Sequence, residues 1–167
     1  MTGLTSPAMP AALDGVVMRI AEPNDVPAML ALHQRCSADS LRFRYLSAYV
    51  PDEATLLAMI SRTHTLLAWH DDSVIGMGNL VFESHIAELA LLVEDAWQGR
   101  GVGWLVGTEL AQLARHRGAT TLNATTAGSN RRVHELMGRI AGVPMTVEYA
   151  EGTAYVTCPL TTSSTVL

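Results

Sequence analysis

The chain has 167 residues, and its 49% hydrophobic content is enough to build the core of one compact domain. Its formal net charge of −5 argues against a nucleic-acid-binding protein, because such proteins present basic surfaces. All eleven basic residues are arginines, which excludes lysine as a catalytic amine.

Apolar periodicity divides the chain into short strands and helices. Asn24 or Asp25 is the expected N-cap of the first helix, and Asp71-Asp72-Ser73 and Glu151-Gly152 lie between apolar runs and predict hairpin turns. In chain order we expect a strand at 15–21, helices at 24–33, 37–50 and 51–62, a hairpin within 65–84, a strand at 85–93, a helix at 102–118, a strand at 119–126, a helix at 129–140 and a hairpin at 144–160. This order predicts an α/β sandwich around a mixed sheet, as one domain over 15–160 with flexible tails at 1–14 and 161–167.

Residues 97–104 read WQGRGVGW and join an expected strand to an expected helix. Unpaired N–H groups at a helix N-terminus attract anions, and Gly99, Gly101 and Gly103 let the backbone approach phosphate oxygens closely. A P-loop is excluded because the chain has no lysine, and the dinucleotide-binding fingerprint fails because Trp104 stands where its third glycine belongs. A plain strand-to-helix turn needs only one glycine, so the pattern predicts an anion site to which Arg100 adds a charge.

The run Gln98-Gly99-Arg100-Gly101-Val102-Gly103 resembles the Q/R-x-x-G-x-G/A pyrophosphate loop of the GNAT superfamily of acyl-CoA-dependent N-acetyltransferases. The resemblance covers roughly Val16–Pro159, and segments 37–47 and 87–103 are most similar to actinobacterial protein lysine acetyltransferases. It implies the GNAT fold, a mixed and mostly antiparallel sheet of six to seven strands with helices on both faces. It also implies acetyl-CoA as cosubstrate and no metal.

The same resemblance implies which residues hold the coenzyme. The implied contacts are the backbones of Leu91 and Val93, the loop residues Gln98, Gly99, Arg100, Gly101, Val102, Gly103 and Trp104, and Asn130. Two of these residues also have structural explanations that the sequence leaves open. Asn130 can equally be the N-cap of the following helix, and Trp104 can be a packing residue.

Glu88 is the candidate general base. Strand alternation places it on one face with Ala90 and Leu92, and an apolar setting would raise the pKa of its carboxyl group. A glutamate tuned in this way suits deprotonation of an amine whose usual pKa is about 10.4. A glutamate that faces the edge or pairs with an arginine is the alternative, and Glu83 and Glu94 are expected to be solvated.

A proton donor for the leaving thiolate is missing from its usual place. The tyrosine that many superfamily members carry seven residues after the asparagine is replaced by Met137. Water, or a residue such as His134, would then protonate the thiolate.

Three functions remain open. The first is acetylation of a protein lysine, for example in an acyl-CoA synthetase, and the second is acetylation of a small amine such as a polyamine or an antibiotic. The third, suggested by the missing tyrosine, is an acyl-CoA-binding module without turnover. Segment 37–51 and the final hairpin are expected to form the acceptor site. We expect a cytoplasmic monomer or homodimer with no nucleic-acid or membrane partner, because the N-terminus lacks a charged leader and no apolar run is long enough to cross a bilayer.

Overall fold

The computed structural model describes residues 13–142 and 144–160, and these ranges contain seven strands and five α-helices. The expected tails, apart from Leu13 and Asp14, lie outside the described residues. The elements in chain order are β1 (Val16–Ile20), α1 (Val26–Arg35), α2 (Ala38–Tyr45), α3 (Glu53–Arg62), β2 (His64–His70), β3 (Ser73–Glu83), β4 (Ile86–Val93), α4 (Val102–His116), β5 (Thr121–Ala127), α5 (Arg131–Ala141), β6 (Thr146–Ala150) and β7 (Thr153–Pro159). Single 3-10 turns at Pro23–Asp25 and Asp95–Trp97 precede α1 and the glycine loop.

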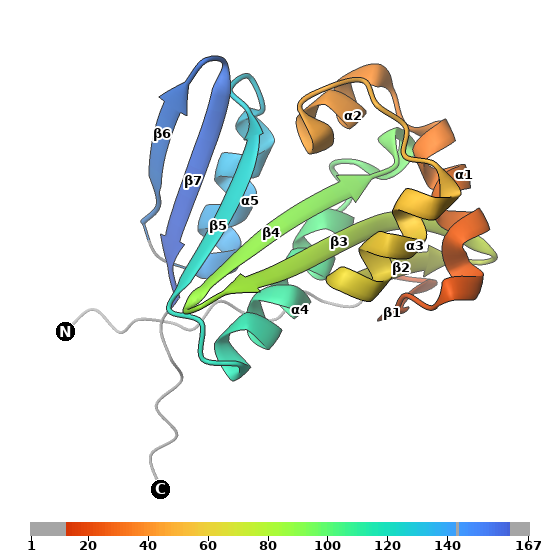
Figure 1. Ribbon diagram of the computed structural model, residues 1–167, viewed down its shortest axis with the longest axis horizontal. Helices are drawn as coiled ribbons and strands as arrows, with labels where there is room; N and C mark the ends of the chain where they lie inside the picture. Colours follow the sequence, from red (N-terminus) through yellow and green to blue (C-terminus); the bar gives the residue numbers. More distant parts are fainter. Residues whose placement is uncertain (1–12, 143, 161–167) are drawn as a thin grey trace, which may run out of the picture.

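All seven strands form one sheet in the order β1-β2-β3-β4-β5-β7-β6 (Figure 1). The β4–β5 pair is parallel, and every other pair of neighbours is antiparallel. This confirms the expected mixed and mostly antiparallel sheet. The two expected hairpins are also present, with Asp71 and Glu151 at positive φ in their turns.

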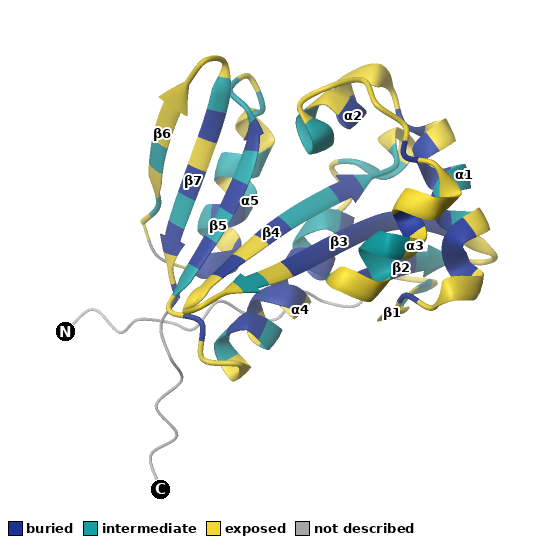
Figure 2. Ribbon diagram, viewed as in Figure 1, coloured by how far each residue is buried: buried dark blue, intermediate teal, exposed yellow. Residues whose placement is uncertain are grey.

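Helices cover both faces of the sheet and enclose two separate cores. Along β2 the side chains alternate between the faces, so that Leu66 packs with α4 and α5 while Leu67 packs with α1 and α3. Helix α4 lies close to β3 because Gly78 has no side chain: a Cβ atom there would lie 2.6 Å from both Val106 and Leu110. Figure 2 shows the buried residues concentrated where the helices meet the sheet.

Strands β4 and β5 pair at only one end, and this opens the sheet. The register joins Ile86–Glu88 to Thr121–Asn123 and then stops, while β5 continues to pair with β7 along its whole length. Figure 1 shows the two strands diverging beyond this point. Residues 89–93 of β4 therefore have a strand partner on the β3 side alone. The opening passes from the face covered by α4 and α5 to the face covered by α2.

Two local expectations differ from the structure. The helix expected over 37–50 ends at Tyr45, because Leu46 adopts the left-handed conformation with φ 61°. Asp25 does begin α1, but its side chain makes no cap bond to the helix. Instead its carboxylate accepts hydrogen bonds from the Glu22 N–H at 2.7 Å and from the Arg19 guanidinium at 2.6 and 2.7 Å.

Candidate active site

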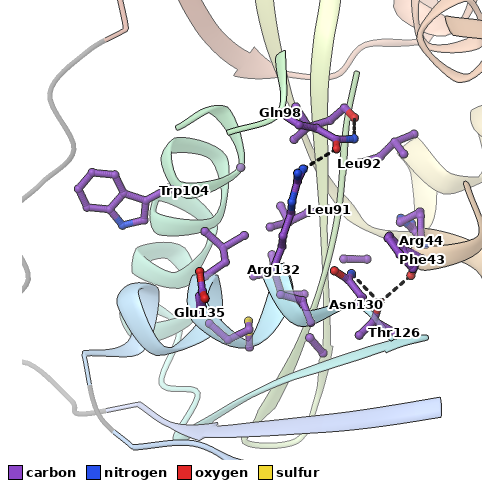
Figure 3. A pocket seen from close by; sticks show the side chains of 18 of the residues that line it. Phe43, Arg44, Leu91, Leu92, Gln98, Trp104, Thr126, Asn130, Arg132 and Glu135 are labelled. Carbon is purple, nitrogen blue, oxygen red and sulfur yellow. Dashed lines mark hydrogen bonds between the residues drawn. The ribbon is translucent and has the colours of Figure 1, made fainter. Parts of the chain in front are cut away.

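A pocket of about 410 Å³ occupies the opening between β4 and β5 (Figure 3). Volumes of this size are typical of sites for small molecules and cofactors. The pocket is lined by Ser40, Phe43 and Arg44 of α2, residues 89–93 of β4, Gln98, Gly99, Gly101, Gly103 and Trp104, residues 124–126 of β5, and Asn130, Arg132, Val133, Glu135, Leu136, Met137 and Arg139. It thus joins the glycine loop to the inner surface of α2.

The glycine loop presents main-chain donors at the start of α4. Gly99 and Gly101 have φ values of 72° and 95°, which other residues rarely adopt, and Gly101 is the N-cap of α4. The Leu105 N–H donates to the Gly101 carbonyl at 3.0 Å, so the N–H groups of residues 102–104 precede the first bond of the helix. The expected anion-binding geometry is therefore present at this helix N-terminus.

Gly103 differs from Gly99 and Gly101 in that its φ is not positive. It lies within α4, and a Cβ atom there would meet Leu136 at 3.5 Å and Val93 at 3.6 Å, which are ordinary contact distances. These distances concern neighbouring side chains, so the close approach of a phosphate to Gly103 stays a prediction.

Gln98 connects three walls of the pocket. Its Nε2 atom donates to the Ser40 hydroxyl at 2.9 Å and to the Val93 carbonyl at 3.0 Å, and its Oε1 atom accepts from Arg132 at 2.8 Å. Figure 3 shows the Arg132 side chain extended across the pocket toward Gln98. These bonds hold the start of the loop against α2, β4 and α5 together.

Asn130 belongs to a second chain of hydrogen bonds at the other end of the pocket. Its Nδ2 atom donates to Thr126 Oγ1 at 2.9 Å, and the Thr126 hydroxyl donates to the Phe43 carbonyl at 2.9 Å. Asn130 occupies the N-cap position of α5, but its side chain makes no cap bond. Its side chain therefore ties α5 to β5 and, through Thr126, to α2.

Arg44 is a half-buried cation in the pocket wall. One Nη atom donates to Asn79 Oδ1 at 3.0 Å, and the guanidinium lies 4.4 Å from the centre of the Tyr45 ring. Its Nε atom is fully buried and has no hydrogen-bond partner among the described residues. Burial lowers the pKa of Arg44, while the electrostatic effects of Tyr45 and Glu88 act in the opposite direction.

Glu88 does not line the pocket, and its expected apolar setting is wrong. The side chains on its face of β4 become more buried toward the C-terminal end of the strand. Ile86 and Glu88 are exposed, Ala90 is half-buried, and Leu92 is buried in the core beneath α1 and α3. Helical cover on this face thus reaches the C-terminal half of β4 and stops short of Glu88. Burial lowers the pKa of Arg44 and the charge of Glu88 opposes this shift, but the two side chains form no salt bridge within 4.0 Å.

The structure brings most of the sequence-predicted coenzyme residues together. Of the expected set, the pocket does not include Arg100 and Val102. The exposed Arg100 guanidinium lies 4.1 Å from the centre of the Trp97 ring, and the Val102 side chain is buried in the core. Trp104 lines the pocket and also packs under Arg139, whose guanidinium lies 4.3 Å from its ring.

Other titratable candidates have structural partners or are buried. Glu94, expected to be solvated, pairs with Arg35 at 3.1 Å. Burial raises the pKa of Cys36 to about 12 and that of Cys158 to about 11, so neither thiol is a ready nucleophile at neutral pH. Met137 lines the pocket at the position of the expected proton donor and is fully buried.

Sequence reasoning did not single out Arg44 or Arg132. Arg44 lies in the segment expected to form the acceptor site, but nothing in its spacing distinguishes it from Arg42, which is exposed. Arg132 follows Asn130 by two residues, and only its bond to Gln98, 34 positions earlier, places it over the pocket. Long-range contacts of this kind leave no periodic signal in the sequence.

Every described helix is too short or too polar to span a bilayer. Within residues 13–142 and 144–160, no group of three or more His, Cys, Asp or Glu side chains is arranged to hold a metal ion.

The family model described as "Acetyltransferase (GNAT) family" matches residues 27–143. Among solved structures, the GNAT domain of PAT from S. lividans has a TM-score of 0.74 with 20% identity, over 86% of this chain and 89% of that domain. The yncA protein of Salmonella typhimurium, described as a putative acetyltransferase with its cofactor acetyl-CoA, has a TM-score of 0.70 with 18% identity, over 90% of this chain and 97% of that one. The paia N-acetyltransferase of Thermoplasma acidophilum, in complex with coenzyme A, has a TM-score of 0.70 with 15% identity, over 86% and 98%. No curated protein matches the chain in sequence.

Proposed function

The chain belongs to the acetyltransferase (GNAT) family, and on that premise we propose that it transfers acetyl from acetyl-CoA to a protein lysine side chain, with Glu88 as general base. Use of acetyl-CoA and transfer to an amine follow from the family itself. The acceptor and the roles of individual residues are the proposed part. The observation that carries the proposal is the opening between β4 and β5, which has main-chain donors at one end and Arg44 in its wall. The pairing of β4 with β5 stops at Glu88, so the opening begins next to this residue.

The residues around the glycine loop fit the diphosphate of the coenzyme. The N–H groups of residues 102–104 carry the positive end of the α4 dipole, and Arg132 supplies a side-chain cation at the same end of the pocket. The unpaired side of β4 at Leu91 and Val93 offers main-chain groups to an extended arm, as an added strand would use them. Trp104 lines this part of the pocket, and Asn130 lines the other end.

Glu88 is proposed to remove the proton from the acceptor amine. A lysine-like ammonium has a pKa of about 10.4, so almost none of it is neutral at pH 7. Glu88 lies on the face of the sheet that α2 and Arg44 share, while α4 and α5 lie on the other face. The proposed acceptor amine approaches from the α2 face, on which Glu88 is exposed.

Bound acetyl-CoA supplies the acyl group as a thioester, whose thiolate needs little acid to leave because the pKa of a thiol is about 8.5. Met137 has no proton to give, and the hydroxyl groups of Ser40 and Thr126 are both engaged in hydrogen bonds. We therefore propose that solvent water protonates the leaving thiolate.

A protein acceptor is supported by the surface beside the pocket. Leu46, Tyr49 and Val50 follow α2 and are 47%, 46% and 42% exposed, so they offer apolar contacts to an incoming chain. The fold similarity to the GNAT domain of PAT is consistent with this choice. A small amine is the second candidate, favoured by the α2 end of the pocket, where Phe43 and Arg44 line a concave wall. A cytoplasmic location is part of the proposal and fits the two free cysteines.

The test is release of free thiol from acetyl-CoA in the presence of lysine-containing proteins, including an acyl-CoA synthetase, and of small amines. The Glu88→Gln variant is expected to lower kcat/KM by about 10²-fold or more at pH 7. The deficit is expected to shrink as the pH rises toward the pKa of the amine, because solvent then deprotonates the acceptor. Glu83→Gln, which changes an exposed glutamate at the end of β3, is the matched control and is expected to be as active as the unaltered protein.

Two results would contradict this proposal in different ways. Equal activity of Glu88→Gln at every pH would remove Glu88 as the base while keeping the transferase. Tight binding of acetyl-CoA with no thiol release from any acceptor would instead favour a binding module.

A further inference from the structure

Arg44 is a cation in the pocket wall for which the described part of the chain provides no ion-pair partner. No carboxylate among the described residues lies within 4.0 Å of its guanidinium, whereas Arg19, Arg35 and Arg42 each have such a partner. Its fully buried Nε atom also lacks a hydrogen-bond acceptor. A desolvated charge without a counter-charge is unfavourable, and structures keep one where a bound molecule completes the pair.

The Arg44 side chain is held in place by residues that do not belong to the pocket. Its Nη atom donates to Oδ1 of Asn79, a buried residue of β3. The Nδ2 atom of Asn79 donates to Thr63 Oγ1 at 3.2 Å and to Thr65 Oγ1 at 3.0 Å, which fixes the amide with its oxygen toward Arg44. The Tyr45 ring packs against the guanidinium at 4.4 Å. One of the four Nη N–H donors is thus used for positioning, and the other three make no hydrogen bond to the described residues and remain for a ligand.

The position of Arg44 relative to Glu88 suggests what that ligand is. Both residues lie on the α2 face of the sheet, close enough for the Glu88 charge to favour the charged form of Arg44. Arg44 lies in the pocket wall, and Glu88 lies on the same side of the sheet, next to the first lining residue of β4; together they are complementary to a molecule that carries an amine and a carboxylate near each other. Arginine binds carboxylates well because its planar donors match both oxygens.

We propose that Arg44 binds a carboxylate of the acceptor, so that the preferred acceptors carry a carboxylate close to the amine that is acetylated. The carboxylate belongs either to a free amino acid or to an acidic side chain beside a lysine in a protein. This inference rests on the proposed transferase activity and specifies its acceptor. Arg44 then determines which acceptor is preferred, while Glu88 removes the proton from the acceptor amine.

The test compares acceptors that differ only in the carboxylate. One pair is an amino acid and its carboxamide, and the other is a lysine peptide with a neighbouring glutamate or glutamine; each pair is compared at equal concentrations of neutral amine. With the unaltered protein, kcat/KM for the acidic member is expected to exceed that for the neutral member by on the order of 10- to 100-fold. The pair with the larger ratio identifies the source of the carboxylate.

Arg44→Met removes the charge and keeps most of the length of the side chain. It is expected to bring the acidic-to-neutral ratio close to one, mainly through KM for the acidic acceptor, with KM for acetyl-CoA unchanged. Arg44→Lys is expected to retain part of the preference because it keeps the charge and loses the paired donors. Arg42→Met is the matched control, because Arg42 lies on the same helix but is exposed and pairs with Asp39, and it is expected to keep the full ratio.

Each outcome decides the inference. Equal use of acidic and neutral acceptors by the unaltered protein overturns it, and this comparison needs no variant to fold. An Arg44→Met variant that binds acetyl-CoA and loses activity equally toward both members also overturns it, because Arg44 would then serve only to position Glu88. If no member of any pair releases thiol from acetyl-CoA, the proposed transferase activity itself fails.

Discussion

The Nη1 atom of Arg132 donates to the Oε1 atom of Gln98 over 2.8 Å, and this bond joins the first turn of α5 to the loop before α4. Because α5 and the loop stand on opposite sides of the opening between β4 and β5, the bond crosses the pocket mouth (Figure 3). Arg132 therefore lies where an anion held by the α4 N-terminus would meet a second, side-chain cation.

We expect Arg132→Met to weaken binding of acetyl-CoA about 5- to 30-fold, because a charge-assisted contact contributes on the order of 1–2 kcal/mol. The difference is expected to narrow at high salt, where charge interactions are screened. Titration calorimetry at two ionic strengths measures both effects. Arg131→Met is the matched control: Arg131 is exposed on the same turn and does not line the pocket. Equal weakening by both variants would mean that the overall charge of α5 matters, and not the position of Arg132.

A comparison of alanine variants at Gly101 and Gly118 separates the effect of the loop on acetyl-CoA binding from its effect on stability. Gly101 has φ 95° and is the N-cap of α4, so Gly101→Ala is expected to destabilise the protein by about 1 kcal/mol or more and to weaken acetyl-CoA binding. Gly118→Ala is the control, because Gly118 has φ 83° at the other end of α4 and a Cβ there would meet nothing within 4 Å. It is expected to lower the midpoint of thermal unfolding by a similar amount and to leave the affinity unchanged. Loss of affinity in Gly118→Ala would show that general destabilisation, and not the loop, accounts for the effect at Gly101.

The hydrogen-bonded pair of buried His33 and half-buried Tyr45 holds α2 against α1. The Met29 carbonyl lies 2.7 Å from His33 Nδ1 and can only accept, so Nδ1 is the donor and Nε2 accepts from the Tyr45 hydroxyl at 2.7 Å. Tyr45→Phe is expected to lower the free energy of unfolding by about 1–3 kcal/mol, because the buried Nε2 loses its partner. Tyr49→Phe is the control, since Tyr49 is exposed, and a change below about 0.5 kcal/mol is expected. Urea unfolding at pH 7 measures both, and equal losses in the two variants would count against the buried bond.

His33 also predicts the pH dependence of stability. Burial holds the pKa of His33 below its usual value of 6.5, so the folded state binds this proton less readily than the unfolded state does. The stabilisation from the neutral ring is therefore complete above about pH 6.5 and is lost as the pH falls from there through the folded pKa. We expect the unfolding free energy to decrease between pH 7 and pH 5, and His33→Gln to reduce this dependence. An unchanged pH profile in that variant would assign the dependence to other groups.

Local sequence patterns were enough for most of the fold. Alternation in 85–93 and the apolar face of 102–118 predicted β4 and α4, and both formed near those bounds because the apolar positions repeat with the period of each element. The glycines at 99 and 101 likewise predicted the loop, since positive φ is a property of the single residue. The end of α2 at Tyr45 was not predictable, because Leu46 is an unusual residue to adopt a left-handed conformation.

The sequence by itself determined the strand–loop–helix unit that offers main-chain donors, and with it the resemblance to acetyl-CoA-dependent transferases. The tertiary structure alone decided which side chains face the opening in the sheet. The pairing of β4 with β5 stops after Glu88, and whether Arg44 meets Asn79 or Arg132 meets Gln98 depends on contacts between positions 34 or 35 residues apart. Periodicity reports the conformation and the buried face of one segment, whereas the distance between two segments is set by how the helices pack on the sheet.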